Sequence, residues 1–175
     1  MRPVTIAAVL LTAFAGSVAY GAAPAELEPL GFLIGQWSAS GAGQPGAASG
    51  AATFTRSLQD RVILRTSYAE YPATAEKPAS RHDDLIVIYA VAGGGLRADY
   101  YDNEGHIIHY AVRSPAPREA IFLSDSDGGP RFRLSYKLEA TGVLRGEFAV
   151  SPPGAGEAFK PYLTWESHKE PGVSK

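Results

Sequence analysis

The sequence contains no cysteine, and its 16 Lys and Arg residues nearly balance its 18 Asp and Glu residues. Without thiols the chain can form no disulfide, iron–sulfur cluster, cysteine zinc site or thiol nucleophile. A net charge of −2 gives no basic surface that would draw the protein onto nucleic acid, so we expect no nucleic-acid partner. The fold must therefore be stabilised by a packed apolar core.

Motifs that carry catalysis are also missing. There is no Gly-x-Ser-x-Gly elbow, and the glycine run 93–95 lacks the Lys and Ser or Thr of a phosphate-binding loop. The four histidines show no helical His-x-x-x-His spacing, and His106 and His109, three apart on a strand, point to opposite faces. We interpret the His-Asp-Asp segment 82–84 as solvated charges in an exposed loop. We therefore predict no catalytic residue, no metal and no cofactor.

One long apolar run is present, and it lies at the N-terminus. After Met and Arg, the nearly uncharged segment Val4–Val18 is long enough for a signal peptide and short for a membrane helix, which needs about 20 residues. Ala19 and Gly21 are small residues at the −3 and −1 positions that signal peptidase requires. The sequence predicts a signal peptide over 1–21, a periplasmic or secreted protein that starts at Ala22, and no membrane span after cleavage. An uncleaved anchor is the alternative.

Beyond Gly35 the sequence breaks into short runs in which apolar and polar residues alternate, separated by Gly, Pro, Asn and Asp. This pattern is typical of antiparallel strands. It predicts a short helix or 3₁₀ turn at 24–35 and longer connections at 72–83 and 152–158. The ten predicted strands lie near 36–43, 50–58, 61–71, 84–91, 96–102, 106–113, 119–124, 131–139, 143–150 and 159–168.

Ten short strands with almost no helix predict a single all-β domain over residues 22–175. An antiparallel up-and-down barrel is favoured over a sandwich, because a meander of this many strands otherwise leaves two exposed edges. A barrel of eight strands can be just filled by side chains, whereas ten strands leave room for a ligand.

The segment Leu30–Trp37, which reads Leu-Gly-Phe-Leu-Ile-Gly-Gln-Trp, resembles the opening of a family of exported bacterial proteins of unknown function that begin with a Phe-Leu-x-Gly-x-Trp motif. The likeness continues through a Tyr-Asp-x-x-Gly turn at 101–105 and an aromatic last strand with a basic tail at 161–169. The resemblance implies a lipocalin-like, calycin-type barrel and no established reaction. In such barrels a basic side chain of the last strand covers the Trp, so we expect Trp37 to be a packing residue beneath His168 and Lys169.

The Gly35-x-Trp37 pair, followed by Gly41 and Gly43, is also similar to the start of the nitrobindin-type haem barrel. That family coordinates haem through a His in its late strands. Here Tyr162 stands near the comparable place and His168 lies six residues further on, which departs from the family. We therefore expect no haem.

Tyrosines are spread over many predicted strands, and a Tyr suits a wet apolar wall because its ring packs while its hydroxyl can bind a ligand. The leading hypothesis is an interior that binds a small apolar molecule, lined by Tyr100 or Tyr101, His109, Tyr162 and Trp165. Tyr100 and Tyr101 point to opposite faces, so only one can line it. Tyr162 and Trp165 share a face only if a bulge intervenes, which the neighbouring proline favours.

Two other functions remain open at this point. A structural or partner-binding envelope protein would have its barrel filled with side chains. An enzyme is the third alternative, because no group of residues has catalytic spacing. The oligomeric state has no signal in the sequence.

Overall fold

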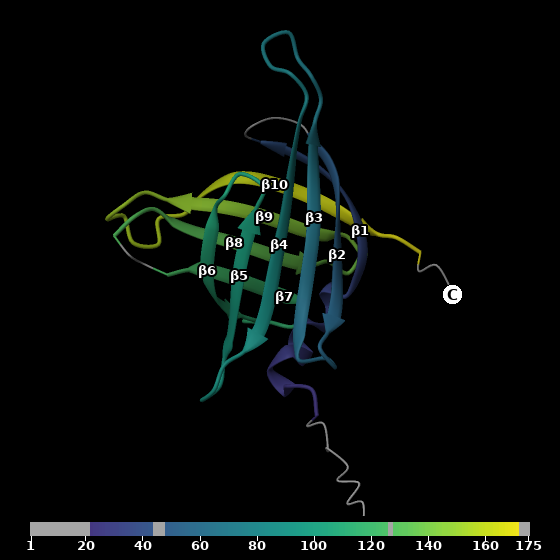
Figure 1. Ribbon diagram of the computed structural model, residues 1–175, viewed down its shortest axis with the longest axis vertical. Coiled ribbons are helices and arrows are strands. Elements are labelled where there is room, and N and C mark those ends of the chain that lie inside the picture. The colour runs from purple at the N-terminus through teal and green to yellow at the C-terminus, as the bar shows by residue number, and fades with distance from the viewer. Residues whose placement is uncertain (1–21, 44–47, 126–127, 172–175) are drawn as a thin grey trace, which may run out of the picture.

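The computed structural model describes residues 22–43, 48–125 and 128–171, so the predicted signal peptide at 1–21 lies outside the described residues. Ten antiparallel strands form a closed barrel in chain order (Figure 1). Within the described ranges, no helix is long and apolar enough to cross a membrane. The strands are β1 (Gly35–Gly43), β2 (Ala48–Ser57), β3 (Val62–Tyr71), β4 (Ser80–Ala90), β5 (Leu96–Asp102), β6 (Ile107–Arg113), β7 (Glu119–Ser124), β8 (Arg131–Leu138), β9 (Leu144–Ser151) and β10 (Lys160–Lys169).

The barrel closes because β1 pairs with the strands on both sides of it. Trp37 lies opposite Ala52 of β2 and opposite Lys169 of β10. Each strand therefore has two neighbours and no edge is left to pair with another chain. The predicted all-β, up-and-down barrel of ten strands with a short N-terminal helix is confirmed.

Side chains alternate between the interior and the outer face along each strand. On β8, Leu134 and Tyr136 are buried inside, whereas Arg133 and Lys137 form ion pairs with outward-facing glutamates on β9 and β7. The predicted strand at 84–91 is longer than expected, because β4 begins at Ser80. The connection before it is accordingly 72–79 rather than 72–83.

The two ends of the barrel differ. The η1 end carries the 3₁₀ helix η1 (Ala25–Leu33) and the turns 58–61, 91–95, 114–118 and 139–143, and the far end carries the connections 72–79, 103–106 and 152–159. Leu27, Leu30 and Leu33 of η1 are fully buried. The helix is short and depends on this packing, because so few residues do not form a stable helix alone. It seals the η1 end, as Figure 1 shows at the bottom of the view.

Trp37 packs against this seal. Its side chain is 1% exposed, and its indole Nε1 donates to the carbonyl of Leu33 over 2.7 Å. Lys169 Nζ lies 5.4 Å from the centroid of the Trp37 ring, which is the contact expected of a basic residue on the last strand. His168 makes no such contact: it pairs with Ser38, has the opposite parity to Lys169 and is exposed on the outer face.

Candidate functional site

The interior is packed at the η1 end and partly accessible at the far end. Buried inward-facing residues near η1 are Phe54, Ile63, Ile88, Leu96, Val112, Ala120 and Leu144. Toward the far end, inward-facing residues keep part of their surface exposed: Ser67, Ala69, His82, Tyr100, Ile108, Phe132, Phe148, Leu163 and Trp165. The barrel is therefore less tightly packed at the far end than at the η1 end. We call this region the upper interior.

The floor of the upper interior holds a buried ion pair. Arg65 of β3 is 5% exposed and donates to the Asp84 carboxylate on β4 and to the Tyr136 hydroxyl on β8. Ser67 donates to the second oxygen of Asp84 over 2.8 Å. Burial alone would lower the pKa of Arg65, but the Asp84 charge and the Tyr136 hydroxyl raise it above its ordinary value. Arg65 therefore stays charged, while its Nε is buried without a hydrogen-bond partner.

His82 of β4 lies above this pair, between two oxygen groups. Its Nδ1 is 3.1 Å from Glu104 Oε1, and its Nε2 is 2.9 Å from the hydroxyl of Tyr100 on β5. Its Nε2 is also 3.7 Å from Asp84 Oδ2, too far for a hydrogen bond. Tyr100 donates to Asp102 over 3.0 Å. Burial, followed by the charges of Asp84 and Asp102, raises the pKa of Tyr100, so its hydroxyl stays protonated.

Asp102 anchors the β5–β6 turn. Its side chain is almost fully buried, and its Oδ1 accepts the backbone N–H groups of Glu104 (3.0 Å) and His106 (2.9 Å). Its Oδ2 accepts from Tyr100 and lies 2.8 Å from His106 Nδ1. Burial would raise the pKa of Asp102, but these hydrogen bonds lower it below its ordinary value. His106 in turn has its pKa raised, first by its hydrogen bond to Asp102. We call Arg65, Ser67, His82, Asp84, Tyr100, Asp102 and Glu104 the polar wall.

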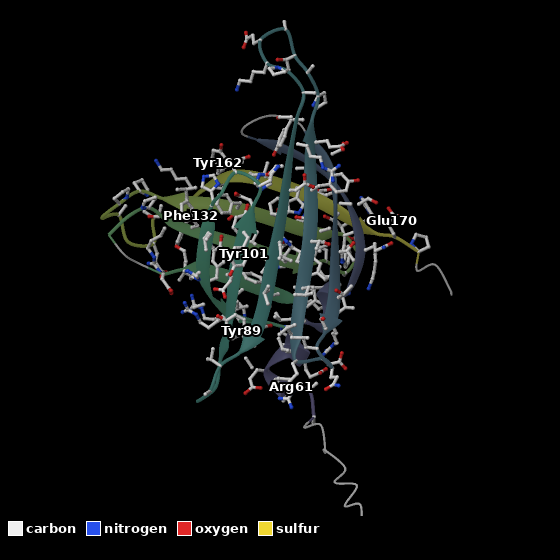
Figure 2. The ribbon with its side chains drawn as sticks, viewed as in Figure 1. Arg61, Tyr89, Tyr101, Phe132, Tyr162 and Glu170 are labelled. Carbon is white, nitrogen blue, oxygen red and sulfur yellow. The ribbon has the colours of Figure 1, made fainter. Side chains whose placement is uncertain are left out.

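Aromatic rings of β8, β9 and β10 form the opposite side of the upper interior. Phe132 and Phe148 stack with ring centroids 5.7 Å apart, and the Tyr162 ring meets Phe148 edge-on at 6.3 Å. Trp165 meets Tyr136 edge-on at 5.9 Å. Figure 2 labels Phe132 and Tyr162 on this side of the barrel. We call Phe132, Phe148, Tyr162 and Trp165 the aromatic wall.

Small residues lie between these two walls. Ala39, Ala52 and Ala69 have inward parity on the adjoining strands β1, β2 and β3, and none is fully buried. Gly146 of β9 gives room to Trp165, because a Cβ at Gly146 would lie 2.0 Å from the indole Cε2. The indole therefore lies directly on the β9 backbone.

Three of the five predicted ligand-binding residues lie at the upper interior. Tyr100 faces inward, Trp165 faces inward, and Tyr162 lies at the far end. The predicted irregularity is present, because the register of β10 shifts between Pro161 and Leu163. A bulge there lets Tyr162 and Trp165 serve the same side despite their odd spacing.

The other two predicted residues lie outside. Tyr101 is 39% exposed on the outer face, where Figure 2 labels it beside Tyr89. His109 was also expected to line the interior, and this is wrong. It pairs with Asp99 across β5 and β6, has outward parity, and its exposed ring lies with Nδ1 2.6 Å from the Asp99 carboxylate.

Residues of the polar wall were missed by sequence reasoning. The segment 82–84 is part of β4 and not a loop, so His82 and Asp84 face inward. The sequence did contain a signal for Asp84. An unbroken apolar run follows it and predicts a buried strand, and a charged residue at the start of a buried strand is unusual. Arg65 likewise follows a Val-Ile-Leu run and had such a signal.

A groove of about 790 Å³ lies over β7 to β10 and is lined mostly by outward-facing residues, together with Tyr136, Gly146 and Trp165. On the outer face, Lys137 pairs with Glu119 at 2.7 Å and Arg145 pairs with Glu139 at 2.5 Å. Among the described residues, no group of three or more His, Asp or Glu side chains is arranged to hold a metal ion.

The fold and this geometry define a closed ten-stranded antiparallel barrel with one sealed end and a partly accessible, two-sided interior. No protein-family profile matches the chain, and no curated protein sequence matches it.

Proposed function

We propose that the protein binds a small amphipathic molecule in the upper interior. The observation that carries this proposal is the contrast in burial between the two ends: inward residues at the η1 end are packed, whereas those of both walls keep part of their surface exposed. Side chains alone can fill a barrel of eight strands, whereas the ten strands of this barrel enclose more space. A ligand between the walls would gain about 25 cal/mol for each Å² of apolar surface that it buries.

The two walls suggest a ligand with two kinds of surface. The stacked and edge-on rings of Phe132, Phe148 and Trp165 suit a flat or branched apolar body. The polar wall suits a hydrogen-bonding group that fixes the orientation of that body. The purely apolar ligand expected from the sequence would leave the remaining lone pairs of Asp84 without a hydrogen-bond donor. For this reason the proposed ligand is amphipathic.

The proposal includes export and a calycin-type relationship. The N-terminal segment 1–21 has the composition of a signal peptide, and the motif around Trp37 resembles exported lipocalin-like proteins. A periplasmic or secreted binding protein must fold without the disulfides common in that setting, which fits a single packed barrel. The competing function, a structural or partner-binding envelope protein, is favoured by the filled η1 end alone.

The test uses an uncharged probe, so that its outcome does not depend on the ligand's charge. N-phenylnaphthylamine fluorescence is titrated with the mature protein and with two variants of β3. Ala69→Trp fills the upper interior, because Ala69 has inward parity, whereas Thr66→Trp places the same ring on the outer face. Both variants are first checked for an unchanged far-UV circular dichroism spectrum.

The proposal expects dye binding at tens of micromolar or tighter that Ala69→Trp weakens at least about tenfold, which corresponds to about 1.4 kcal/mol, while Thr66→Trp leaves it unchanged. Equal binding by both variants would place the dye elsewhere and contradict the proposal. No binding by the parent protein would favour the structural function.

A further inference from the structure

The hydrogen-bond donors of the polar wall are already used by its own acceptors. Both terminal nitrogens of Arg65 are engaged by Asp84 and Tyr136, and the Ser67 hydroxyl by Asp84. Tyr100 has a single hydroxyl hydrogen, which it gives to Asp102. Both ring nitrogens of His82 face partners, so no tautomer of His82 leaves a donor for a ligand.

Acceptor capacity, in contrast, remains. An ionised carboxylate offers about four lone-pair sites. Asp102 accepts four contacts and is saturated, whereas Asp84 accepts only from Arg65 and Ser67, and Glu104 only from His82. Asp84 faces the upper interior and keeps about a tenth of its side chain exposed. A ligand group that meets this wall must therefore donate hydrogen bonds.

The charged groups of the wall are already paired with one another. Arg65 pairs with Asp84, and His106 pairs with Asp102. His82 donates to Glu104 from Nδ1 and to the Tyr100 hydroxyl from Nε2, because the hydroxyl hydrogen of Tyr100 goes to Asp102. An anionic ligand would bring another acceptor to a wall whose remaining capacity is for donors. Arg65 Nε is the one buried donor without a partner among the residues of this site, and it has almost no surface exposed to solvent.

The aromatic wall adds a second attraction for a cation. Phe148, Tyr162 and Trp165 present ring faces and edges to the same interior. Ring faces attract ammonium groups within about 6 Å of their centroids, most strongly those of Trp. Such an attraction is independent of the carboxylates, because it comes from β9 and β10 on the other side of the barrel.

We infer that the ligand is a protonated organic amine on an aromatic or other apolar body, with its ammonium group on Asp84. This inference rests on the proposed binding function and adds the chemical class of the ligand. The ammonium donates to the free lone pairs of Asp84, Glu104 at the rim adds attraction, and the body lies on the aromatic wall. Carboxylate-headed lipids are disfavoured, because the wall has no free donor for a carboxylate.

The experiment compares three molecules that share one body and differ in the polar group: naphthylethylamine, naphthylethanol and naphthylacetate. Isothermal titration calorimetry at neutral pH measures the Kd of each for the mature protein. We expect the amine to bind at least about tenfold more tightly than the alcohol, and the acetate to bind more weakly than both.

Three variants test the residues involved. Asp84→Asn should reduce the preference for the amine over the alcohol to about twofold or less, and Glu104→Gln should reduce it by about threefold. Asp99→Asn makes the same charge change on the outer face of β5 and should leave the preference unchanged. Glu104 is exposed, so its variant is expected to fold even if Asp84→Asn does not.

The outcomes separate this inference from the proposed function. If the alcohol or the acetate binds most tightly, the barrel has a ligand site but the ligand is not an amine. If the amine preference survives in both Asp84→Asn and Glu104→Gln, the wall does not select the ligand and the inference is wrong. If none of the three binds, both the inference and the proposed function fail.

Discussion

Arg65 of β3 donates a hydrogen bond to the hydroxyl of Tyr136 on β8, five strands away in the closed barrel. The guanidinium therefore links opposite sides of the interior at the level where the packed core ends. Tyr136 is in turn surrounded by Phe54, Phe122 and Trp165 at edge-on angles. The pair forms the floor on which the upper interior rests.

The first prediction concerns the ion pair within this floor. Asp84→Ala should destabilise the protein by about 3–5 kcal/mol, because it leaves the buried Arg65 charge without its partner. The double change Arg65→Met with Asp84→Leu should recover most of that loss, since an apolar pair needs no compensation. Urea unfolding at neutral pH measures both.

A surface pair provides the control. Asp125→Ala removes the partner of Arg97 on the outer face and should cost no more than about 1 kcal/mol, because exposed ion pairs contribute little. If Asp84→Ala costs as little as this control, the Arg65 charge is not buried as described.

The second prediction concerns pH and the pair His106–Asp102. Because the folded protein raises the pKa of His106, the pair adds stability that is fully present below the ordinary value of 6.5 and is lost as pH rises through the folded midpoint. The lowered pKa of Asp102 works in the opposite direction: its contribution is present above 3.8 and is lost as pH falls through the folded pKa.

Histidine NMR titration checks this prediction directly. The midpoint of His106 should lie above 6.5 in the parent and return toward 6.5 in Asp102→Asn. Asp99→Asn, which alters the carboxylate beside His109 instead, should leave the midpoint of His106 unchanged. A midpoint at or below 6.5 in the parent protein would contradict the hydrogen bond between His106 and Asp102.

The third prediction concerns the packing role of Trp37. Trp37→Ala should cost about 3–5 kcal/mol, because the ring is buried against η1 and its loss leaves a cavity beside Leu33. Lys169→Met removes only the cation–π contact and should cost about 0.5–1 kcal/mol. Thermal melts of both variants give the comparison. A melting temperature for Trp37→Ala within a few degrees of the parent is the outcome that rules out this packing role.

The strands could be predicted from the sequence because each has one buried side. The predicted strand boundaries at 96–102 and 119–124 agree with the structure to the residue, because glycine and proline residues flank both strands. Parity alone also predicted correctly that Tyr100 and Tyr101 point to opposite faces of the barrel. The same parity argument, applied to the pairing of β5 with β6, would have placed His109 outside, but the pairing register has no clear signal in a single sequence.

The alternation of apolar and polar residues could not place the polar wall, for a different physical reason. In Val-Ile-Leu-Arg, at 62–65, residues of both parities are apolar, so alternation does not mark which face is inward. The buried charge of Arg65 is compensated only because the side chain donates to Asp84 on β4 and to Tyr136 on β8. Such a compensation depends on the closed barrel and on three segments far apart in the chain.

Export is the fourth prediction. When the full chain is expressed in a bacterium, the protein recovered from the envelope fraction should begin at Ala22, because Ala19 and Gly21 fit the cleavage site. Edman sequencing and intact mass measure this. Ala19→Leu, which places a bulky residue at the −3 position, should block the cleavage. An envelope protein that retains Met1 would show that the segment is not a cleaved signal peptide.

The fifth prediction tests the aromatic wall through Gly146. A Cβ at this position would lie 2.0 Å from Trp165 Cε2 and 2.2 Å from its Cζ2, so Gly146→Ala must displace the indole from the β9 backbone. We expect a loss of about 1–3 kcal/mol in the free energy of unfolding, together with a shifted tryptophan emission spectrum and weaker dye binding.

Gly31→Ala is the matched control for this variant, because a Cβ at Gly31 would meet nothing closer than an Arg56 nitrogen at 4.0 Å. It should leave the emission spectrum and the dye affinity unchanged, since Gly31 lies in η1 at the sealed end. If Gly146→Ala also matches the parent in stability, emission and dye binding, Trp165 does not lie against β9. The aromatic wall would then have to be formed without it, and the ligand site moved toward Phe132 and Phe148.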